Sequence, residues 1–422
     1  MRPNEGKSIS QMILRAVLLA LFSIGPLGAQ GPEWIDVPGL DSEYESDRFM
    51  SDIPWDWRES FWASPSGVQM TGGSMNIRHL YLQQDIKLRV PLVENRFWFR
   101  YRYQKFDTLE RNRSDSLWEF EYRPWRDWFV SFLGEPRYHK AEANMGARVR
   151  WGRAENRSVD AAILFPNFDT NYAFHNTSVN EGYQEFYDDF PKDVRLTAVW
   201  SGHGTSVRAQ ARKMTLWRKQ HRDLTTPFVE YRETGGETDL SVEMRCRGER
   251  FGVTLEGEYW DELRSVWFSQ TAFGQGRRRD QVRRLVRPAA EWYWDHTGTA
   301  RIGFFTVRRR ESLVYSDPAV ASRFERQNET LPFVQVIKKF GRVIEAEMAY
   351  VHDRQRTTRE YGAETFSKRE ENRLKLACGF QFTPSTSLRL VTGWELDKRD
   401  FGRFAYFDGG TVQFQAVFGG VQ

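Results

Sequence analysis

The sequence has few cysteines and little excess charge of either sign. Cys246 and Cys378 are its two cysteines, with no CxxC pair and no histidine at a zinc-ligand spacing. A disulfide scaffold or a structural zinc site is therefore not expected. The 61 Lys and Arg residues nearly cancel the 57 Asp and Glu residues, which leaves a net charge of +4. This balance does not indicate a generic nucleic-acid-binding protein.

Long apolar runs are also lacking, apart from one near the N-terminus. Arg2, Lys7 and Arg15 precede or enter the run 16–24, and small residues follow it up to Ala29. The run is shorter than the ~20 residues with which a helix spans a bilayer. It is typical of a signal peptide cleaved after Ala29, with translation starting at Met1 or Met12. We therefore expect an exported protein without a helical anchor.

Aromatic residues, in contrast, are abundant. They make up 15% of the chain, although 28% of the residues are charged and the mean hydropathy is only -0.65. Disordered chains combine low hydropathy with few aromatics, so disorder is excluded for most of the sequence. The length fits two or three ordinary domains, or one large all-β barrel.

From about residue 78 the chain alternates apolar and polar residues with period two, in segments of about ten residues. No helical period competes over a comparable length. Such alternation is typical of β-strands with one apolar face and one polar face. The clearest segments are 80–90, 97–104, 145–151, 194–200, 240–247, 251–259, 374–382 and 412–418.

The connections between these segments alternate in length. Short turns are predicted at 123–126, 154–156, 339–342 and 384–386, and long polar stretches at 167–192, 309–328, 353–370 and 397–409. Short turns on one rim and long loops on the other are typical of outer-membrane barrels. The alternation fails once, because turns at 234–236 and 247–249 would follow one another. A further strand at 265–273 is predicted to restore it.

Period two also fits a soluble β-sandwich, but three features favour a membrane barrel. These are the export signal, the aromatic clusters beside short turns, such as Trp118 to Trp128, and the Phe-rich last strand. Dividing the mature chain by roughly twenty residues per strand gives about 18 strands, with 16 or 20 as alternatives. The predicted fold is all-β, a closed antiparallel transmembrane β-barrel.

The predicted organisation has four parts. Residues 1–29 form the signal peptide, 30–75 an N-terminal periplasmic or plug-like segment, 76–418 the barrel and 419–422 a C-terminal tail. The segment 30–75 is acidic at its start and aromatic later, without sustained alternation. It fits a plug, a docking tail or an unstructured leader into the first strand.

If the apolar face contacts lipid, the opposite face lines a water-filled lumen. Arginines, with some glutamates, dominate this face. A guanidinium offers a fixed fork of donors to carboxylate, sulfate or phosphate, and several such sites would let an anion move stepwise. In the alternative interpretation, these arginines pair with the glutamates and hold the wall together. The lumen candidates are Arg89, Arg100, Arg102, Arg148, Arg150, Arg195, Arg208, Arg245, Arg247, Arg373, Arg389, Glu243, Glu256 and Glu258.

With these features the chain resembles the larger outer-membrane porins and, in its arginine-rich strands and ~18-strand size, barrels of the alginate-export type. The resemblance covers 76–418 and is one of pattern, without a fingerprint that assigns single residues. It implies the outer membrane of a Gram-negative-type envelope, insertion by the barrel assembly machinery, and contact with lipid and lipopolysaccharide. It also implies passive transport, without a cofactor, of an anionic solute or exopolysaccharide.

Other classes stay open. One is a secreted soluble β-sandwich that binds or acts on carbohydrate, and another is a surface or assembly-platform barrel with a closed lumen. An enzyme, for instance an outer-membrane phospholipase, is not expected, because the seven histidines are scattered and no catalytic or metal-binding motif has a credible context. The basic runs 277–287 and 308–310 are predicted in or near loops. They fit solvated loops or sites for lipopolysaccharide phosphates.

Overall fold

The computed structural model describes fourteen segments of the chain. They are residues 67–71, 74–76, 80–107, 112–137, 142–153, 157–166, 183–189, 191–223, 230–268, 276–316, 322–361, 363–383, 386–397 and 411–418. The predicted signal peptide, most of the segment 30–75 and the tail 419–422 lie outside them. Within these ranges, no helix is long and apolar enough to cross a bilayer.

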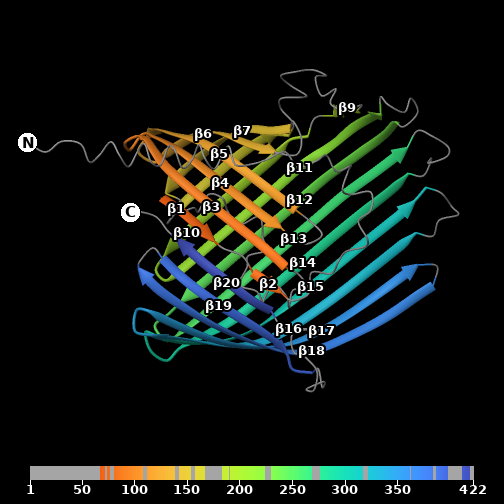
Figure 1. The fold of residues 1–422 in the computed structure, drawn as a ribbon. Helices are drawn as coiled ribbons and strands as arrows, with labels where there is room; N and C mark the ends of the chain where they lie inside the picture. Colours follow the sequence, from red (N-terminus) through yellow and green to blue (C-terminus); the bar gives the residue numbers. More distant parts are fainter. Residues whose placement is uncertain are drawn as a thin grey trace, which may run out of the picture. The chain divides into compact units, whose positions relative to one another are not determined.

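The described residues form twenty β-strands, which lie side by side in one antiparallel sheet (Figure 1). The strands are β1 (Gly67–Thr71), β2 (Ser74–Asn76), β3 (Leu80–Val93), β4 (Phe97–Asp107), β5 (Asn112–Trp125), β6 (Trp128–Arg137), β7 (Glu142–Arg153), β8 (Arg157–Phe165), β9 (Tyr183–Asp189), β10 (Asp193–Gly202), β11 (Thr205–Asp223), β12 (Glu230–Arg247), β13 (Phe251–Phe268), β14 (Arg277–Tyr293), β15 (Gly298–Tyr315), β16 (Arg323–Phe340), β17 (Ile344–Tyr361), β18 (Ala363–Thr383), β19 (Thr386–Glu395) and β20 (Thr411–Phe418).

Each strand pairs with its neighbours in the chain, with two departures from this rule. β8 pairs with β10, while β9 and β10 pair with successive parts of β11. At the other departure, β1 and β2 lie one after the other between β3 and β20. β9 with β10, and β1 with β2, therefore each occupy one position in the order of strands. β20, the last strand that the structure describes, therefore pairs with both β1 and β2.

The register shows that the charged residues share one face of the sheet. Residues directly opposite each other on paired strands point to the same side. Arg100 of β4 faces Glu119 of β5, Ser131 of β6 faces Arg148 of β7, and Arg150 faces Asp160 of β8. Following these pairs from β3 to β19 links the polar positions into one continuous face, called here the inward face.

The polarity of the two faces is the reverse of that in a soluble protein. On β5, the inward Glu119 and Glu121 are 0% exposed, whereas the outward Phe120 and Tyr122 are exposed. Large apolar side chains with 37–69% exposure recur on the outward face of most strands. The predicted two-faced strands 97–104, 145–151, 194–200, 240–247, 251–259 and 374–382 are confirmed, because the register places their charged residues on the inward face and their apolar residues on the outward face.

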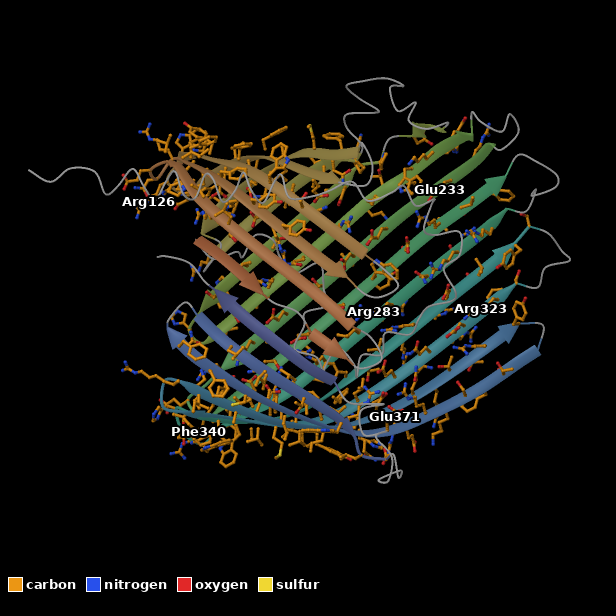
Figure 2. All side chains as sticks on the ribbon, in the orientation of Figure 1. Arg126, Glu233, Arg283, Arg323, Phe340 and Glu371 are labelled. Atoms are coloured by element: carbon orange, nitrogen blue, oxygen red, sulfur yellow. The ribbon has the colours of Figure 1, made fainter. Side chains whose placement is uncertain are left out.

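Outward aromatic residues collect beside the short turns, as the sequence predicts. Figure 2 places Arg126 and Phe340 at this end of the strands, and Glu233 and Arg323 toward the other. The exposed aromatic residues nearest the short turns are Trp125, Trp128, Trp151, Phe251, Trp292, Trp294, Phe340 and Phe382. In the turn between β10 and β11, His203 and Gly204 both have positive φ, as a tight hairpin of the I′ type requires.

Two predictions about the middle of the chain are wrong. Residues 234–236 form no turn but lie within β12, and residues 265–268 belong to β13 instead of a separate strand. Gly235 faces Trp217 of β11, and a Cβ at Gly235 would lie only 2.5 Å from the Trp217 ring. The glycine therefore makes room for an indole on the adjacent strand, which a sequence pattern cannot distinguish from a turn signal.

Two predicted long loops are also largely strand. β15 continues to Tyr315 and β16 begins at Arg323, which leaves little of the stretch 309–328 as a loop. β17 ends at Tyr361 and β18 begins at Ala363, within the stretch 353–370. Both faces of the strands are polar here. The alternation of apolar and polar residues therefore disappears, although the backbone pairing between the strands continues. The basic runs predicted in loops accordingly lie on β14 and β15.

Candidate functional site

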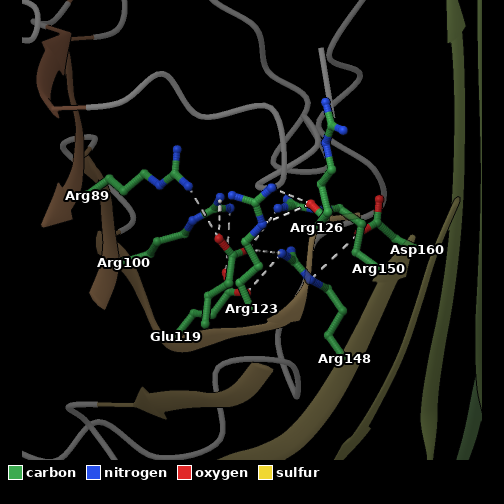
Figure 3. Close-up of polar contacts among 9 residues, drawn as sticks. Arg89, Arg100, Glu119, Arg123, Arg126, Arg148, Arg150 and Asp160 are labelled. Atoms are coloured by element: carbon green, nitrogen blue, oxygen red, sulfur yellow. Dashed lines mark hydrogen bonds and ion pairs between the residues drawn. The ribbon is translucent and has the colours of Figure 1, made fainter. Parts of the chain in front are cut away.

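A dense cluster of mostly buried charges lies on the inward face of β3 to β8 (Figure 3). Its centre is Glu121, whose Oε2 lies 2.9 Å from Arg148 Nη2 and 3.1 Å from Arg150 Nη2. Glu121 Oε1 accepts a 3.1 Å hydrogen bond from Arg100 Nη2, and Arg89 Nη2 on β3 lies 3.4 Å away. These side chains come from four strands, β3, β4, β5 and β7, so the register assembles the cluster.

Two further carboxylates complete this cluster. Glu119 Oε1 lies 2.9 Å from Arg148 Nη2, and Asp160 Oδ1 lies 3.7 Å from Arg148 Nε. Four guanidinium groups thus surround three carboxylates, and all of these side chains except the half-buried Arg89 have almost no exposure to solvent. Buried charges persist only when they are paired, because the cost of removing them from water otherwise exceeds their attraction. We call this set, Arg89, Arg100, Glu119, Glu121, Arg148, Arg150 and Asp160, the buried cluster.

Aromatic rings cover one side of the buried cluster. The Arg150 guanidinium lies 4.1 Å from the centroid of Phe129, and that of Arg89 lies 5.1 Å from Trp98. Trp98 and Phe129 are themselves 6.2 Å apart. Arg123 also lies over Phe129 and donates from Nε to the carbonyl of Arg126 in the adjacent turn. These cation–π contacts fix the arginine planes in a region with little water.

A second group of charges crosses β10, β11 and β12. Asp193 Oδ2 accepts a 2.7 Å hydrogen bond from Arg195 Nη2 and lies 3.0 Å from Arg212 Nη2. Arg195 also reaches Glu135 of β6, and Arg212 reaches Glu237 of β12. Arg195 and Arg212 face each other in the register, and Asp193 neutralises this pair.

On β12 to β15 the inward charges form smaller and more open pairs. Arg287 Nη2 lies 2.8 Å from Glu256 Oε1, and Arg283 Nη2 lies 3.5 Å from Glu258 Oε2. Arg245 Nη2 donates to Glu291 Oε2 at 3.0 Å while its side chain remains 47% exposed. Arg245 is thus exposed and Arg283 and Arg287 are half-buried, in contrast to the fully buried Arg148 and Arg150.

The last group lies on β16 to β19. Lys375 Nζ is 3.1 Å from Glu347 Oε1, which also accepts a 2.7 Å hydrogen bond from Gln335. Arg389 donates to Glu345 at 3.0 Å and pairs with Glu347. The inward face is therefore lined with ion pairs from β3 round to β19.

Apolar residues interrupt this inward face at two places. Leu133, Ala162 and Leu164 form a small apolar group, and a larger apolar group joins β14 to β17. The larger cluster, Ala289, Phe305, Leu331, Phe333 and Val351, is almost completely buried. Arg287 lies over Phe305 and Arg301 over Phe333, with their guanidinium groups 4.7 and 5.8 Å from the ring centroids. The rings are covered and so do not form an open stacking surface.

All fourteen lumen candidates lie on the inward face by register, but they form no single site. Arg100, Arg102, Arg148, Arg150 and Arg373 are buried, whereas Arg89, Arg195, Arg208, Arg389, Glu256 and Glu258 are half-buried. Arg245, Arg247 and Glu243 are exposed and lie near the short turn that follows β12. Most of the arginines are ion-paired, as the alternative interpretation of the sequence predicts. Their pairing does not decide which of them a solute meets.

Sequence reasoning missed three acidic residues that hold these groups together. Asp193, Glu135 and Glu237 were not among the candidates, although each pairs with an inward arginine. Asp193 has the same parity as Arg195 on β10, which could have indicated its face. Its second partner, Arg212, could not be found without the register of β10 and β11.

Among the described residues, no group of three or more His, Cys, Asp or Glu residues is arranged to hold a metal ion. Cys246 and Cys378 are both free thiols.

Asp295 lies in the turn after β14, outside the central part of the strands. Hydrogen bonds from Lys338 and Thr297 hold the pKa of Asp295 well below its usual range.

No protein-family model and no curated protein matches the chain. Among solved structures it is similar to OmpTdeltaL8, a loop-deletion mutant of an outer membrane protein of Vibrio cholerae. That match has 9% identity over 83% of this chain and 97% of that chain, with a TM-score of 0.37. It is also similar to a bacterial polysaccharide outer membrane secretin, with 11% identity over 84% and 98% of the two chains and a TM-score of 0.34.

A third similar structure is OccK10 (OpdN) of Pseudomonas aeruginosa, with 9% identity over 84% of this chain and 98% of that chain and a TM-score of 0.38. Because the identities and TM-scores are low, the function proposed below rests on the strands and side chains of this chain itself.

Proposed function

We propose that the protein is an outer-membrane channel whose arginine-weighted lumen passes a hydrophilic, anionic solute. The observation that carries the proposal is the reversed polarity of the sheet. Charged side chains are buried on the inward face, while large apolar side chains are exposed on the outward face. A sheet in water would bury these apolar residues, whereas a sheet in a bilayer presents them to lipid. This polarity disfavours the alternative of a secreted soluble β-sandwich.

The strand order supports a closed barrel of 18 strands. β1 with β2 fills one position and β9 with β10 fills another, so the twenty strands occupy eighteen positions. The pairs of β20 with β1 and β2, and of these with β3, would join the two ends of the sheet. An even number of strands is usual in bacterial barrels, and closure leaves no unpaired edge in lipid.

The width of the apolar band supports insertion in a membrane. On β13, the outward residues Phe251, Val253, Leu255, Gly257 and Tyr259 precede the charged Asp261. Nine residues of a strand at about 3.3 Å each extend about 30 Å, which a tilt of about 40° reduces to about 23 Å in height. This height matches the ~25 Å apolar band of outer-membrane barrels. Export and insertion by the barrel assembly machinery are part of the proposal.

The accessible arginines are the ones that would meet the solute. Arg148 and Arg150 are buried in the wall by Glu121 and aromatic rings. Arg245 and Arg247 are exposed on the inward face near the rim with the short turns. Guanidinium groups that are partly hydrated can bind a carboxylate, sulfate or phosphate without holding it tightly. An acidic exopolysaccharide fits this chemistry, as does a small anion.

The test is ion selectivity of the full chain in planar bilayers. We expect wild-type channels to prefer chloride over potassium, and Arg245→Ala with Arg247→Ala to reduce this preference by up to about fivefold. The reason is that a charge at about 4 Å in a hydrated pore contributes about 1 kcal/mol. The matched control, Arg250→Ala with Arg342→Ala, removes two arginines from exposed short turns and should not change selectivity.

The same experiment tests a second candidate function, a structural barrel with a closed lumen. The nearly complete burial of Glu119, Glu121 and Arg148 favours it, because such charges fill space that water would occupy in an open pore. Insertion without conductance would contradict the channel and support the structural barrel. Conductance with unchanged selectivity in the Arg245 and Arg247 variant would contradict the anionic solute alone.

A further inference from the structure

A second set of cations lies on the opposite, outward face of β14 to β18. These side chains are exposed, and they alternate with the buried inward residues along each strand. We call the set the outward basic belt. It consists of Arg284, Arg308, Arg310, Arg326, Arg356 and Lys368.

The strand register brings these cations together in pairs. Arg284 faces Arg308, Arg310 faces Arg326, and Arg356 faces Lys368. Like charges directly opposite each other on adjacent strands repel and destabilise a sheet. Three such contacts on consecutive strands therefore require a compensating anion or a strongly hydrated setting.

The outward belt has little compensation from the protein itself. Among the described residues, Arg308, Arg310, Arg326 and Arg356 have no ion pair with a carboxylate. Lys368 has one, with Glu370 at 2.8 Å.

Inward arginines on the same strands are compensated. Arg279 Nε lies 2.8 Å from Glu311, and Arg323 Nη2 and Arg359 Nε lie 2.6 and 3.1 Å from Glu325. Some outward arginines are paired as well, such as Arg278 with Asp280 at 3.2 Å and Arg354 with Glu370 at 3.9 Å, but within the described part of the chain Arg308, Arg310, Arg326 and Arg356 of the belt are not.

The height of the belt fits the level of lipid head groups. Arg284 is eight residues along β14 from the rim residue Trp292, and Arg308 is eight residues along β15 from Ala300, which faces Trp292. Eight residues extend about 26 Å, or about 20 Å in height at a tilt of about 40°. Long arginine side chains extend further to the edge of a ~25 Å apolar band.

We propose that the outward basic belt binds the phosphate groups of a phosphorylated glycolipid in the outer leaflet. The belt crosses five strands, about 19 Å at about 4.8 Å per strand, which is wide enough for a head group with two phosphates. Guanidinium pairs suit phosphate oxygens because each offers a planar fork of donors. The inference rests on the outer-membrane location proposed above, but not on the solute.

Lipid binding by the purified full chain in detergent tests this proposal. The probes are bisphosphorylated lipid A and the same lipid after removal of both phosphates. The outward variant combines Arg308→Gln, Arg326→Gln and Arg356→Gln. We expect it to bind bisphosphorylated lipid A about a hundredfold more weakly than wild type, because each cation near an anionic lipid surface contributes about a factor of five. Dephosphorylated lipid should bind equally weakly to both proteins.

The matched control removes three inward arginines from the same strands, with Arg309→Gln, Arg323→Gln and Arg359→Gln, and should bind lipid A like wild type. Equal loss in both variants, equal binding of the two lipids, or displacement by inorganic phosphate alone would overturn the proposal. Conductance, recorded in parallel for wild type, separates the two ideas. A protein that binds lipid A but does not conduct supports the belt and contradicts the channel.

Discussion

The sector from β4 to β8 differs from the sector from β12 to β18 in how it handles charge. Strands of the first sector have 9 to 14 residues, and their inward charges merge into the buried cluster around Glu121. Strands of the second sector have 17 to 21 residues. On β12 to β15 their inward charges include half-exposed pairs such as Arg287 with Glu256, whereas Lys375 and Glu347 on β18 and β17 form a separate buried pair. The first sector buries most of its inward charges within the sheet, whereas the second has exposed charges on both of its faces.

The difference shows that an arginine-rich face is not uniform in function. Removing a charge from water costs several kcal/mol, so a buried guanidinium is committed to its carboxylates. A half-exposed guanidinium pairs weakly and stays available to another anion. The sequence alternation is the same in both sectors and does not separate these two roles.

Removing the central carboxylate of the buried cluster should have the largest effect. Glu121→Gln leaves the guanidinium groups of Arg100, Arg148 and Arg150 close together without their main counter-ion. We expect a loss of about 3–5 kcal/mol in the free energy of unfolding, because breaking a buried pair leaves uncompensated charge. Urea titration of the protein in lipid or detergent, followed by heat-modifiable migration on gels, measures this loss.

The matched change in the second sector is Glu256→Gln, which removes the partner of Arg287. Since both side chains are partly exposed, we expect a loss of about 1 kcal/mol or less. Equal losses in the two variants would contradict the distinction between the two sectors. A larger loss for Glu256→Gln would reverse it.

The apolar cluster of the second sector tests the contribution of packing instead of charge. Phe333→Ala should cost about 3–5 kcal/mol if the cavity cannot collapse, and less if Arg301 moves into the space. Its control is Phe304→Ala, since Phe304 is outward and exposed, and lipid can fill the space that the ring leaves. Comparable losses in urea titration would show that the inward cluster is not packed as a core.

Much of the fold could be predicted because alternation is a local property. Segments such as 251–259 and 374–382 have one apolar and one charged face, and these faces are the ones that the register confirms. The strand ends could not be predicted where both faces become polar. At 309–328 and 353–370 the ladder continues above the apolar band, and only backbone pairing reveals it.

The site could be predicted only in part, for a related reason. The alternation of apolar and polar residues along each strand places Arg148 and Arg245 on the polar face. It does not show that Arg148 is buried and Arg245 exposed. Burial depends on which strands supply carboxylates and rings, as Glu121 and Phe129 do for Arg150. Those partners are brought together by register between strands, which no single segment specifies.

The ion pair of Asp295 and Lys338, in a turn and more exposed than the pair of Glu256 and Arg287, gives the smallest effect and the baseline for both sectors. Asp295, in the turn after β14, accepts hydrogen bonds from Lys338 Nζ and from the Thr297 backbone, both at 2.7 Å. These contacts lower the pKa of Asp295 below its ordinary value. The stabilisation is therefore complete above the unfolded-state pKa of about 3.9 and is lost as the pH falls toward the lower folded-state pKa.

Asp295→Asn keeps an acceptor for Thr297 but removes the charge that faces Lys338. We expect a small decrease in Tm at pH 7, since exposed pairs contribute little, and no difference from wild type once the pH is below both pKa values. Thermal unfolding at both pH values measures the effect, and added salt should reduce it at pH 7. A decrease as large as that of Glu121→Gln would mean that exposure does not control the strength of these pairs, and the two sectors would then differ only in shape.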